Sequence, residues 1–222
     1  MEHLPTYLSF AFICVSFLTL YFLYKASSST WFLFGCLGWL LLQSAASLTG
    51  FYADTQALPP RLFLFLLLPA ILVIVVLFST RKGKQWIDTL DIKWLTYLHI
   101  VRIPVECILF VLFTYKMIPE LMTFEGRNFD ILSGITAPVV GYLAFSKQVF
   151  NNKILLIWNF ICIGLLANIV INAILAAPFP FQQFAFDQPN IAIFYFPFAL
   201  LPGFVVPAVL FAHLVSIRKL MK

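Results

Sequence analysis

Three ionisable side chains stand inside one long apolar stretch of this sequence, which runs from Trp94 to Tyr115. They are His99, Arg102 and Glu106, and their spacing places them on one face of a helix with about 3.6 residues per turn. A charged side chain near the middle of a bilayer costs about 2.5–3.5 kcal/mol. We therefore expect these groups to face protein, water or each other.

This polar face has two interpretations. Arg102 and Glu106 are four residues apart and could form an ion pair that only locks helix packing. Alternatively, Arg102 could anchor an anionic or amphipathic ligand, while Glu106 carries a proton or a cation. Pro104 lies between them and lacks a backbone N–H, so it frees the carbonyl of Ile100 as a further acceptor. Because ionisable groups inside a membrane are functional by default, we predict that this face binds a ligand.

His213, in the last apolar stretch, should lie at the same depth as His99. His213 comes shortly before Arg218 and His99 shortly after Lys93, so both are expected near the basic ends of their helices. Two imidazoles at one level could ligate a metal or a haem. No third ligand stands at a suitable spacing, and no metal or cofactor is predicted. The alternatives are hydrogen bonds that tie helices together and titration as a proton switch.

Two asparagines, Asn168 and Asn172, share one helix face, whereas Asn159 falls on the opposite side. Asparagine in hydrocarbon forms hydrogen bonds between helices, so these residues could serve packing alone. They could instead line the same cavity as Arg102 and Glu106, because all four are expected near mid-membrane. The predicted ligand site comprises His99, Arg102, Glu106, Asn168, Asn172 and His213.

Motifs of common enzyme classes are missing from the sequence. There is no phosphate-binding glycine loop, no Gly-x-Ser-x-Gly elbow and no His-Glu-x-x-His pair. The last apolar stretch has no lysine in its interior, which excludes a retinal Schiff base there. The four cysteines stand in four different apolar stretches and form no redox or zinc motif. Asp130, at the end of a loop with few acidic residues, is expected to cap the next helix.

The composition places the chain in a lipid environment. Of its 222 residues 62% are hydrophobic and 10% charged, against about a quarter charged in soluble proteins. A net charge of +5 would suggest nucleic acid as a partner of a soluble protein. Here the basic residues lie in short loops, where they set membrane topology. We therefore predict membrane lipids as partners and no nucleic acid.

Taking about 20 apolar residues per spanning helix, the pattern predicts an all-α membrane protein with seven transmembrane helices in one domain, residues 1–222. The first stretch lacks a basic leader and is interpreted as a spanning helix and not as a signal peptide. Pro138 predicts a bent or unwound fifth helix. The predicted helices are about 6–25, 30–52, 61–80, 94–115, 131–147, 154–176 and 193–216.

The distribution of Lys and Arg predicts the orientation. If the segments alternate, only Arg61, Lys116 and Arg127 fall on one side of the membrane. Ten other basic residues fall on the opposite side, which puts the N-terminus outside and the C-terminus in the cytoplasm of a cell (inner) membrane. These ten are Lys25, Arg81, Lys82, Lys84, Lys93, Lys147, Lys153, Arg218, Lys219 and Lys222.

An internal similarity suggests a duplicated fold. Residues 65–78 of the third predicted helix align with residues 198–211 of the seventh, and Pro69 matches Pro202. This predicts a parallel repeat of three, one and three helices. Together these patterns favour a bundle that binds, transports or senses a small polar or amphipathic ligand. The alternatives are a membrane-embedded enzyme acting on a lipid or isoprenoid, and a structural subunit of a membrane complex.

Overall fold

The structure, a computed structural model, describes residues 4–222. Helices joined by turns and loops make up the described residues, with no β-strand among them. Five helical stretches are long and apolar enough to cross a membrane, so the fold is compatible with the expected membrane protein. These stretches are Thr6–Ser27, Thr30–Leu48, Ile92–Thr114, Asn152–Leu175 and Leu201–Leu220.

Nine α-helices occur in the part of the chain that the structure describes, and short 3-10 or π-helical turns extend several of them. A 3-10 turn at His99–Val101 joins α5 to α6, and π-helical turns precede α3 and α9 and follow α7. The helices are α1 (Thr6–Ser27), α2 (Thr30–Leu48), α3 (Leu68–Ser79), α4 (Arg81–Thr89), α5 (Ile92–Leu98), α6 (Arg102–Thr114), α7 (Ile131–Gly141), α8 (Asn152–Leu175) and α9 (Val206–Leu220).

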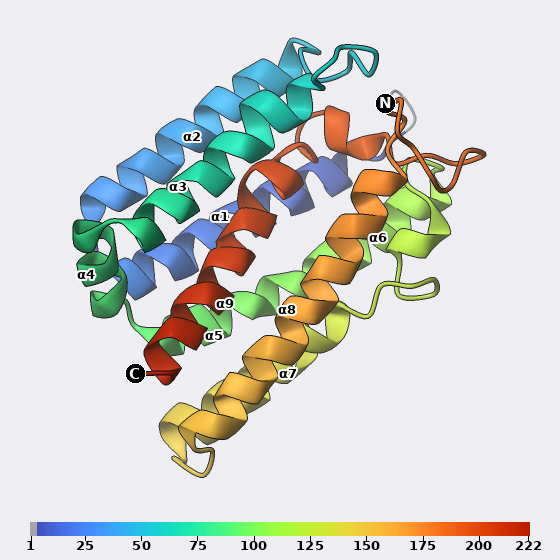
Figure 1. Cartoon of the computed structure of the whole chain (residues 1–222). Helices are drawn as coiled ribbons and strands as arrows, with labels where there is room; N and C mark the ends of the chain where they lie inside the picture. Colours follow the sequence, from blue (N-terminus) through green and yellow to red (C-terminus); the bar gives the residue numbers. More distant parts are fainter. Residues whose placement is uncertain (1–3) are drawn as a thin grey trace.

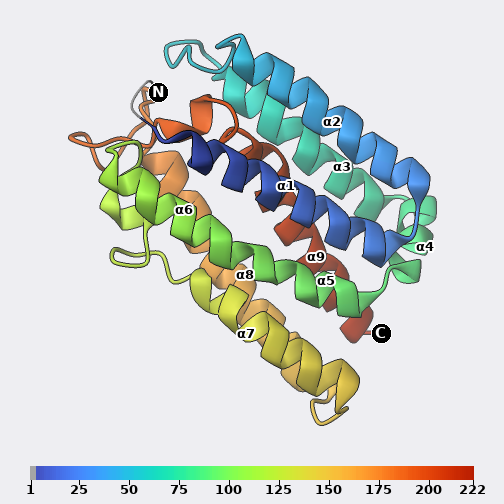
Figure 2. The same cartoon turned by 180° about the vertical axis from the view of Figure 1, so that it is seen from behind.

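The long helices run side by side as a bundle (Figures 1 and 2). Helices α2 and α3 form one edge of the bundle, α7 and α8 the other, and α1, α9 and the α5–α6 rod lie between them. Helix α9 and the α5–α6 rod are the most buried of these, since α9 packs against α5 and α8, and α1 packs against α5 and α6. Leu95, Leu98 and Val101 have no exposed surface, so the α5–α6 rod forms the core around which the polar residues are placed.

Six of the predicted segments begin and end within four residues of an observed helical stretch. The seventh was placed wrongly, because its helix begins at Leu201 and extends to Leu220. Residues 195–200 carry Pro197, which has no N–H and disfavours helical geometry at the residue before it. The fifth segment is not interrupted at Pro138, which lies inside α7, and the irregularity is a π-helical turn at Tyr142–Ser146.

The loop predicted between the third and fourth segments contains a helix, α4. The axis of α4 is bent by 93° from that of the helical stretch Phe63–Ser79. Thr80 caps α4 by accepting a hydrogen bond from the N–H of Gly83 at 3.1 Å. A side chain on Gly83 would meet the Leu77 carbonyl at 2.3 Å, so glycine permits this sharp turn. If α4 is joined to α3, the structure contains six apolar spans.

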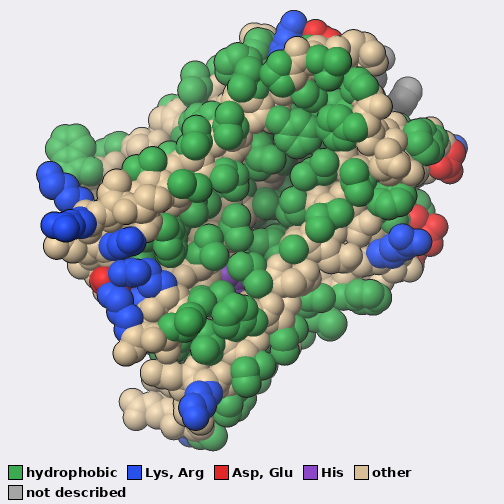
Figure 3. Space-filling model, viewed as in Figure 1, with side chains coloured by type: hydrophobic (Ala, Val, Ile, Leu, Met, Phe, Trp, Pro, Cys, Tyr) green, Lys and Arg blue, Asp and Glu red, His purple; other side chains and the backbone are tan. Residues whose placement is uncertain are grey.

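The two ends of the bundle differ in charge. Figure 3 shows Lys and Arg side chains gathered at the end that holds α4 and the C-terminus, while most of the visible Asp and Glu side chains lie at the opposite end. At the basic end Asp88 of α4 binds Arg218 of α9 at 3.1 Å and also binds Lys222. These ion pairs attach α4 to the end of α9.

Candidate functional site

Arg102 lies at the centre of a buried polar network. Its Nη1 donates to Oδ1 of Asp130 at 2.6 Å, and the two side chains are only 3% and 6% exposed. The same nitrogen lies 3.5 Å from the carbonyl of Cys162. Among the described residues Arg102 therefore pairs with Asp130 and not with Glu106, so the alternative of an Arg102–Glu106 ion pair that locks helix packing is not observed. The α7 helix approaches α6 closely at Gly134, and this contact brings Asp130, at the start of α7, to the guanidinium.

Asp130 does not cap α7 in the way its position predicted. It occupies the N-cap position, but its side chain accepts no hydrogen bond from the first turn. The carboxylate turns inward to Arg102, because leaving a buried guanidinium without a counter-charge costs more free energy than leaving a helix without a side-chain cap. The ion pair therefore joins α6 to the start of α7.

Glu106 binds a different partner, Asn128, in the loop between α6 and α7. Oε2 of Glu106 accepts a hydrogen bond from Nδ2 of Asn128 at 2.5 Å. Asn128 also donates to the carbonyl of Met122 at 3.0 Å, and its Oδ1 accepts from the backbone N–H of Asp130 at 3.0 Å. Asn128 is fully buried. This amide thus fixes the loop between α6 and α7 so that Glu106 and Asp130 face the interior together.

The two histidines meet, at the common level that their spacing from the basic helix ends predicted. The ring centroids of His99 and His213 are 3.9 Å apart and the planes are inclined by 17°. The edge of Trp158 packs against His99, with centroids 5.5 Å apart. Both imidazoles are fully buried. Neither ring nitrogen of His99 has a hydrogen-bond partner among the described residues.

The neighbours of His213 define its tautomer. Nε2 lies 3.0 Å from Nη2 of Arg102, which can only donate, so Nε2 is the acceptor. Nδ1 lies 2.8 Å from Oδ1 of Asn159, whose amide nitrogen donates to the carbonyl of Leu155. Nδ1 therefore carries the proton and His213 is neutral. Among the described residues no group of three or more His, Cys, Asp or Glu side chains is placed to hold a metal ion.

Asn168 and Asn172 are not brought to this network. Asn168 is exposed and donates to the carbonyl of Arg127 at 2.7 Å. Asn172 donates to the backbone and side-chain oxygens of Asn168 at 3.0 and 3.2 Å. Asn168 therefore holds the loop between α6 and α7 against α8, and Asn172 holds the side chain of Asn168. Asn159, which the helical pattern assigned to the opposite side of the helix, is the asparagine that reaches His213.

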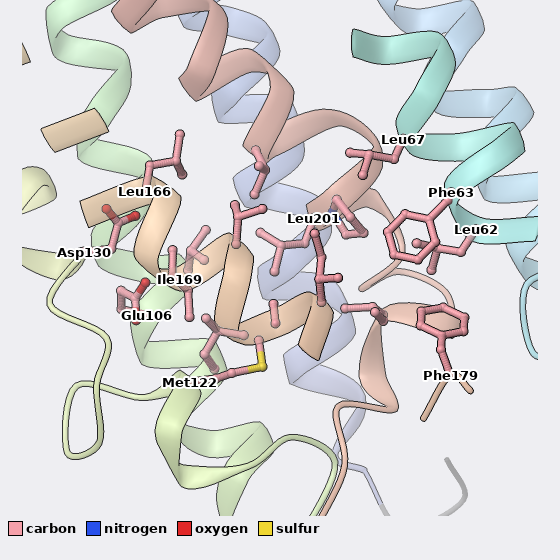
Figure 4. Close-up of a pocket in the computed structure, with 18 residues that line it drawn as sticks. Leu62, Phe63, Leu67, Glu106, Met122, Asp130, Leu166, Ile169, Phe179 and Leu201 are labelled. Atoms are coloured by element: carbon pink, nitrogen blue, oxygen red, sulfur yellow. The ribbon is translucent and has the colours of Figure 1, made fainter. Parts of the chain in front are cut away.

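A cavity of about 90 Å³ adjoins the carboxylate end of the network (Figure 4). Glu106 and Asp130 lie on one side of it, and Phe63 and Phe179 close the other side. Within the described part of the chain, Glu106 and Asp130 are the only charged residues that line the cavity. The remaining lining is apolar and includes Met122, Leu166, Ile169 and Leu201.

The chemistry of the cavity is set by acceptors and not by the guanidinium. Arg102, His99 and His213 do not line it. Ionised carboxylates only accept hydrogen bonds, and a protonated carboxyl both donates and accepts. A molecule with an amine or hydroxyl group beside an apolar part matches this lining, whereas an anion would meet two carboxyl groups.

The residues that sequence reasoning missed are those supplied from outside the α5–α6 rod. Asp130 was expected to cap a helix, Asn159 was assigned to the opposite side of its helix, and Asn128 was not singled out, yet each binds a member of the predicted site. The available signal was the pair of polar residues Asn128 and Asp130 directly before the apolar helix α7. Where α7 crosses α6 closely, residues at the start of α7 lie beside the middle of the α5–α6 rod.

No curated protein and no solved structure matches the chain. A family model described as "Domain of unknown function (DUF8737)" matches residues 59–221, which include every residue of the network and of the cavity. That range covers more than half of the chain, which therefore belongs to the family described as a domain of unknown function, DUF8737.

Proposed function

We propose that this chain is an integral membrane protein with seven spanning helices in one domain, residues 1–222. The five long apolar helices, the bent α3–α4 pair and the shorter apolar stretch Ile131–Ser146 support this number. The concentration of basic residues near α4 and the C-terminus supports a cytoplasmic C-terminus and an external N-terminus, in a cell membrane. A parallel repeat that relates the third and seventh spans is part of this proposal.

The proposed activity is the binding of a small amphipathic molecule in the cavity beside Glu106. The observation that carries it is a carboxyl group that faces an apolar cavity and is bound by a neutral amide, Asn128, and by no cation among the described residues. A carboxylate in such surroundings takes up a proton or a cation to avoid an isolated buried charge. An amine or a hydroxyl on a small apolar molecule would supply that partner.

The size of the cavity limits the ligand. Its volume is about 90 Å³, whereas an apolar cavity of about 150 Å³ accommodates benzene. The site therefore suits a short chain, or the polar end of a longer chain that enters between helices. Its apolar wall would contact the hydrocarbon part, and Glu106 would contact the polar group.

The network around Arg102 has a supporting role in this proposal. Asp130 already has a counter-charge in Arg102, so Glu106 is the carboxyl group available for exchange. A proton and an ammonium group compete for the same carboxylate, and binding of the ammonium group releases the proton. This exchange is the property by which such a site would transport or sense its ligand.

The experiment compares three probes of equal chain length on the protein purified in a neutral detergent. Hexylamine and hexanol should raise the unfolding temperature in a saturable manner, and hexanoate should not. Glu106→Gln keeps an oxygen for Asn128 and should remove the stabilisation by hexylamine. Glu125→Gln, in the exposed part of the outer loop, is the matched control and should bind like the wild type. Stabilisation by hexanoate, or an unchanged response of Glu106→Gln, would contradict the proposal.

A membrane-embedded enzyme acting on a lipid or isoprenoid is the second candidate function. The observation in its favour is the same Glu106 carboxyl, which faces an apolar cavity and could act as a general acid or base. The first candidate is preferred because His99 and His213 do not line the cavity and so add no second acid–base group there. Incubation with farnesol or phosphatidylethanolamine, followed by product analysis, separates the two: a product that Glu106→Gln fails to form would favour the enzyme.

A further inference from the structure

A second and larger cavity lies away from Glu106, between α2, α3 and the start of α9. Its volume is about 430 Å³, within the range of about 300–1,000 Å³ that is typical of small-molecule sites. We call it the α2–α9 groove. It has no charged residue in its lining. The residues that matter below are Phe32, Gly35, Trp39, Val73, Leu77 and Phe211.

Among the described residues, the one side-chain donor of note in the groove, the indole N–H of Trp39, already has a hydrogen-bond partner. The indole nitrogen of Trp39 donates to the carbonyl of Gly203 at 2.8 Å, so that donor is already used. Val73 is 58% exposed. An apolar lining open to the bilayer suits a hydrocarbon chain, because a polar group placed here would find no partner.

One end of the groove is closed by α4. Trp86 of α4 packs against Phe32, with ring centroids 5.0 Å apart, and stacks on Phe211 at 6.1 Å. Both phenylalanines line the groove. The first turn of α4 packs at Gly83 against Leu77, which also lines the groove. Helix α4 is thus fixed directly beside the hydrocarbon-lined space.

Helix α4 brings positive charge to this end. Its first turn contains Arg81, Lys82 and Lys84, of which Arg81 and Lys82 are exposed. Within residues 4–222 none of the three forms an ion pair. Because α4 is bent by 93° from α3, it lies along the membrane surface when α3 spans the bilayer. A short helix that packs through a Trp on one face and is basic on another is typical of the headgroup level.

We infer that the α2–α9 groove binds an anionic phospholipid, with one acyl chain along α2 and α3 and the phosphate beside Arg81 and Lys82. The inference depends on the membrane placement proposed above but not on the cavity at Glu106. Charge complementarity identifies the occupant, since an apolar groove closed at one end by a helix with unpaired cations fits a molecule with a hydrocarbon chain and a terminal phosphate.

The test is native mass spectrometry of the full chain, purified in a neutral detergent and titrated with phosphatidylglycerol or phosphatidylcholine of identical acyl chains. The wild type should retain one phosphatidylglycerol molecule and bind phosphatidylcholine at least about tenfold more weakly. Arg81→Gln/Lys82→Gln should remove most of that preference, at about fivefold in affinity for each cation. Lys147→Gln/Lys153→Gln, which removes two exposed cations, one after α7 and one in the first turn of α8, is the matched control and should keep it.

A second pair of variants tests the groove itself. No atom lies within 4 Å of a Cβ placed on Gly35 or on Gly38, so Gly35→Leu and Gly38→Leu both fit without a clash at Cβ. Only Gly35 lines the groove, and Gly35→Leu should abolish retention of phosphatidylglycerol while Gly38→Leu leaves it intact. Equal binding of the two lipids by the wild type, or full retention by Gly35→Leu, would overturn the inference. So would a dimer that Gly35→Leu converts to monomers, because the occupant would then be a second copy.

Discussion

Arg102 and Asp130 form an ion pair of 2.6 Å in the interior of the bundle, although 28 residues separate them in the sequence. The pair joins the α5–α6 rod to α7. Nη2 of Arg102 also donates a hydrogen bond to Nε2 of His213 in α9, at 3.0 Å. With the carbonyl of Cys162 in α8, four helices therefore meet at one guanidinium. Because this charge is compensated by Asp130, Glu106 is left to face the cavity with an amide as its hydrogen-bond partner.

Removing one member of this pair should be costly. Arg102→Met leaves the Asp130 carboxylate buried without a counter-charge, and we expect a loss of about 3–5 kcal/mol in the free energy of unfolding. The double variant Arg102→Met/Asp130→Leu should recover most of this loss, because neither charge is then left alone. Arg61→Met, at the exposed pair of Arg61 with Asp54, is the control and should cost about 0–1 kcal/mol. Chemical unfolding in detergent micelles measures all three; a double variant as unstable as Arg102→Met would contradict the explanation.

The tautomer of His213 can be observed directly. With Arg102 donating to Nε2 and Asn159 accepting from Nδ1, the ring should be the neutral Nδ1–H form. Nitrogen-15 NMR of histidine-labelled protein should show this form for His213 at neutral pH. Asn159→Leu removes the acceptor and should shift the Nδ1 resonance and destabilise the fold by about 1–3 kcal/mol. An Nε2–H signal in the wild type would contradict the assigned hydrogen bonds, because Nε2 would then point a donor at the Arg102 guanidinium, which can only donate.

Close packing of α7 on α6 depends on a glycine. A Cβ on Gly134 would lie 2.9 Å from Cγ1 and 3.0 Å from the backbone nitrogen of Ile103. Gly134→Ala should therefore push α7 outward and lower the free energy of unfolding by about 1–3 kcal/mol. In Gly164→Ala no atom lies within 4 Å of the new methyl group, and the better helix propensity of alanine should leave stability unchanged or raised by up to about 1 kcal/mol. Comparable losses in the two variants, measured by the same unfolding assay, would exclude close packing as the cause.

Local pattern was sufficient for the helices but not for the partners of the charged residues. The run of apolar residues located α1, α2, the α5–α6 rod and α8 to within a few residues, since a spanning helix needs a continuous stretch of that length. The polar face of His99, Arg102 and Glu106 also follows from helical periodicity alone. Which acid would meet Arg102 depended on the crossing of α6 and α7, and this tertiary contact has no sequence period.

The α4 helix illustrates the same limit from the other direction. Its residues are too polar for an apolar span and were interpreted as a loop, although Thr80 before Arg81 is a capping residue and Trp86 and Ile87 form a small apolar face. The helix is stabilised by contacts of that face with α2 and α9, which only the folded bundle supplies. The two cavities were equally inaccessible to sequence reasoning, because each is lined by segments from at least three helices.

The contact of α4 with the end of α9 should respond to pH. Hydrogen bonds from Lys222 and Arg218 lower the pKa of Asp88 below its ordinary value of 3.8. A carboxyl group whose pKa is lower in the folded state stabilises that state above its unfolded pKa and loses the effect as the pH falls through the folded value. Wild type should therefore be more stable than Asp88→Asn near neutral pH, and the difference should vanish as the pH falls below about 3.8.

Arg218→Gln provides the matched test of that pH dependence. It removes the partner that lies 3.1 Å from Oδ1 of Asp88 and leaves Lys222, so the difference from wild type should have the same sign and a smaller size than in Asp88→Asn. Both differences should shrink in high salt, because all three side chains are partly exposed to solvent. Thermal unfolding in detergent between pH 7 and pH 3 measures them. A pH-independent difference between Asp88→Asn and wild type would mean that Asp88 acts through packing and not through its charge.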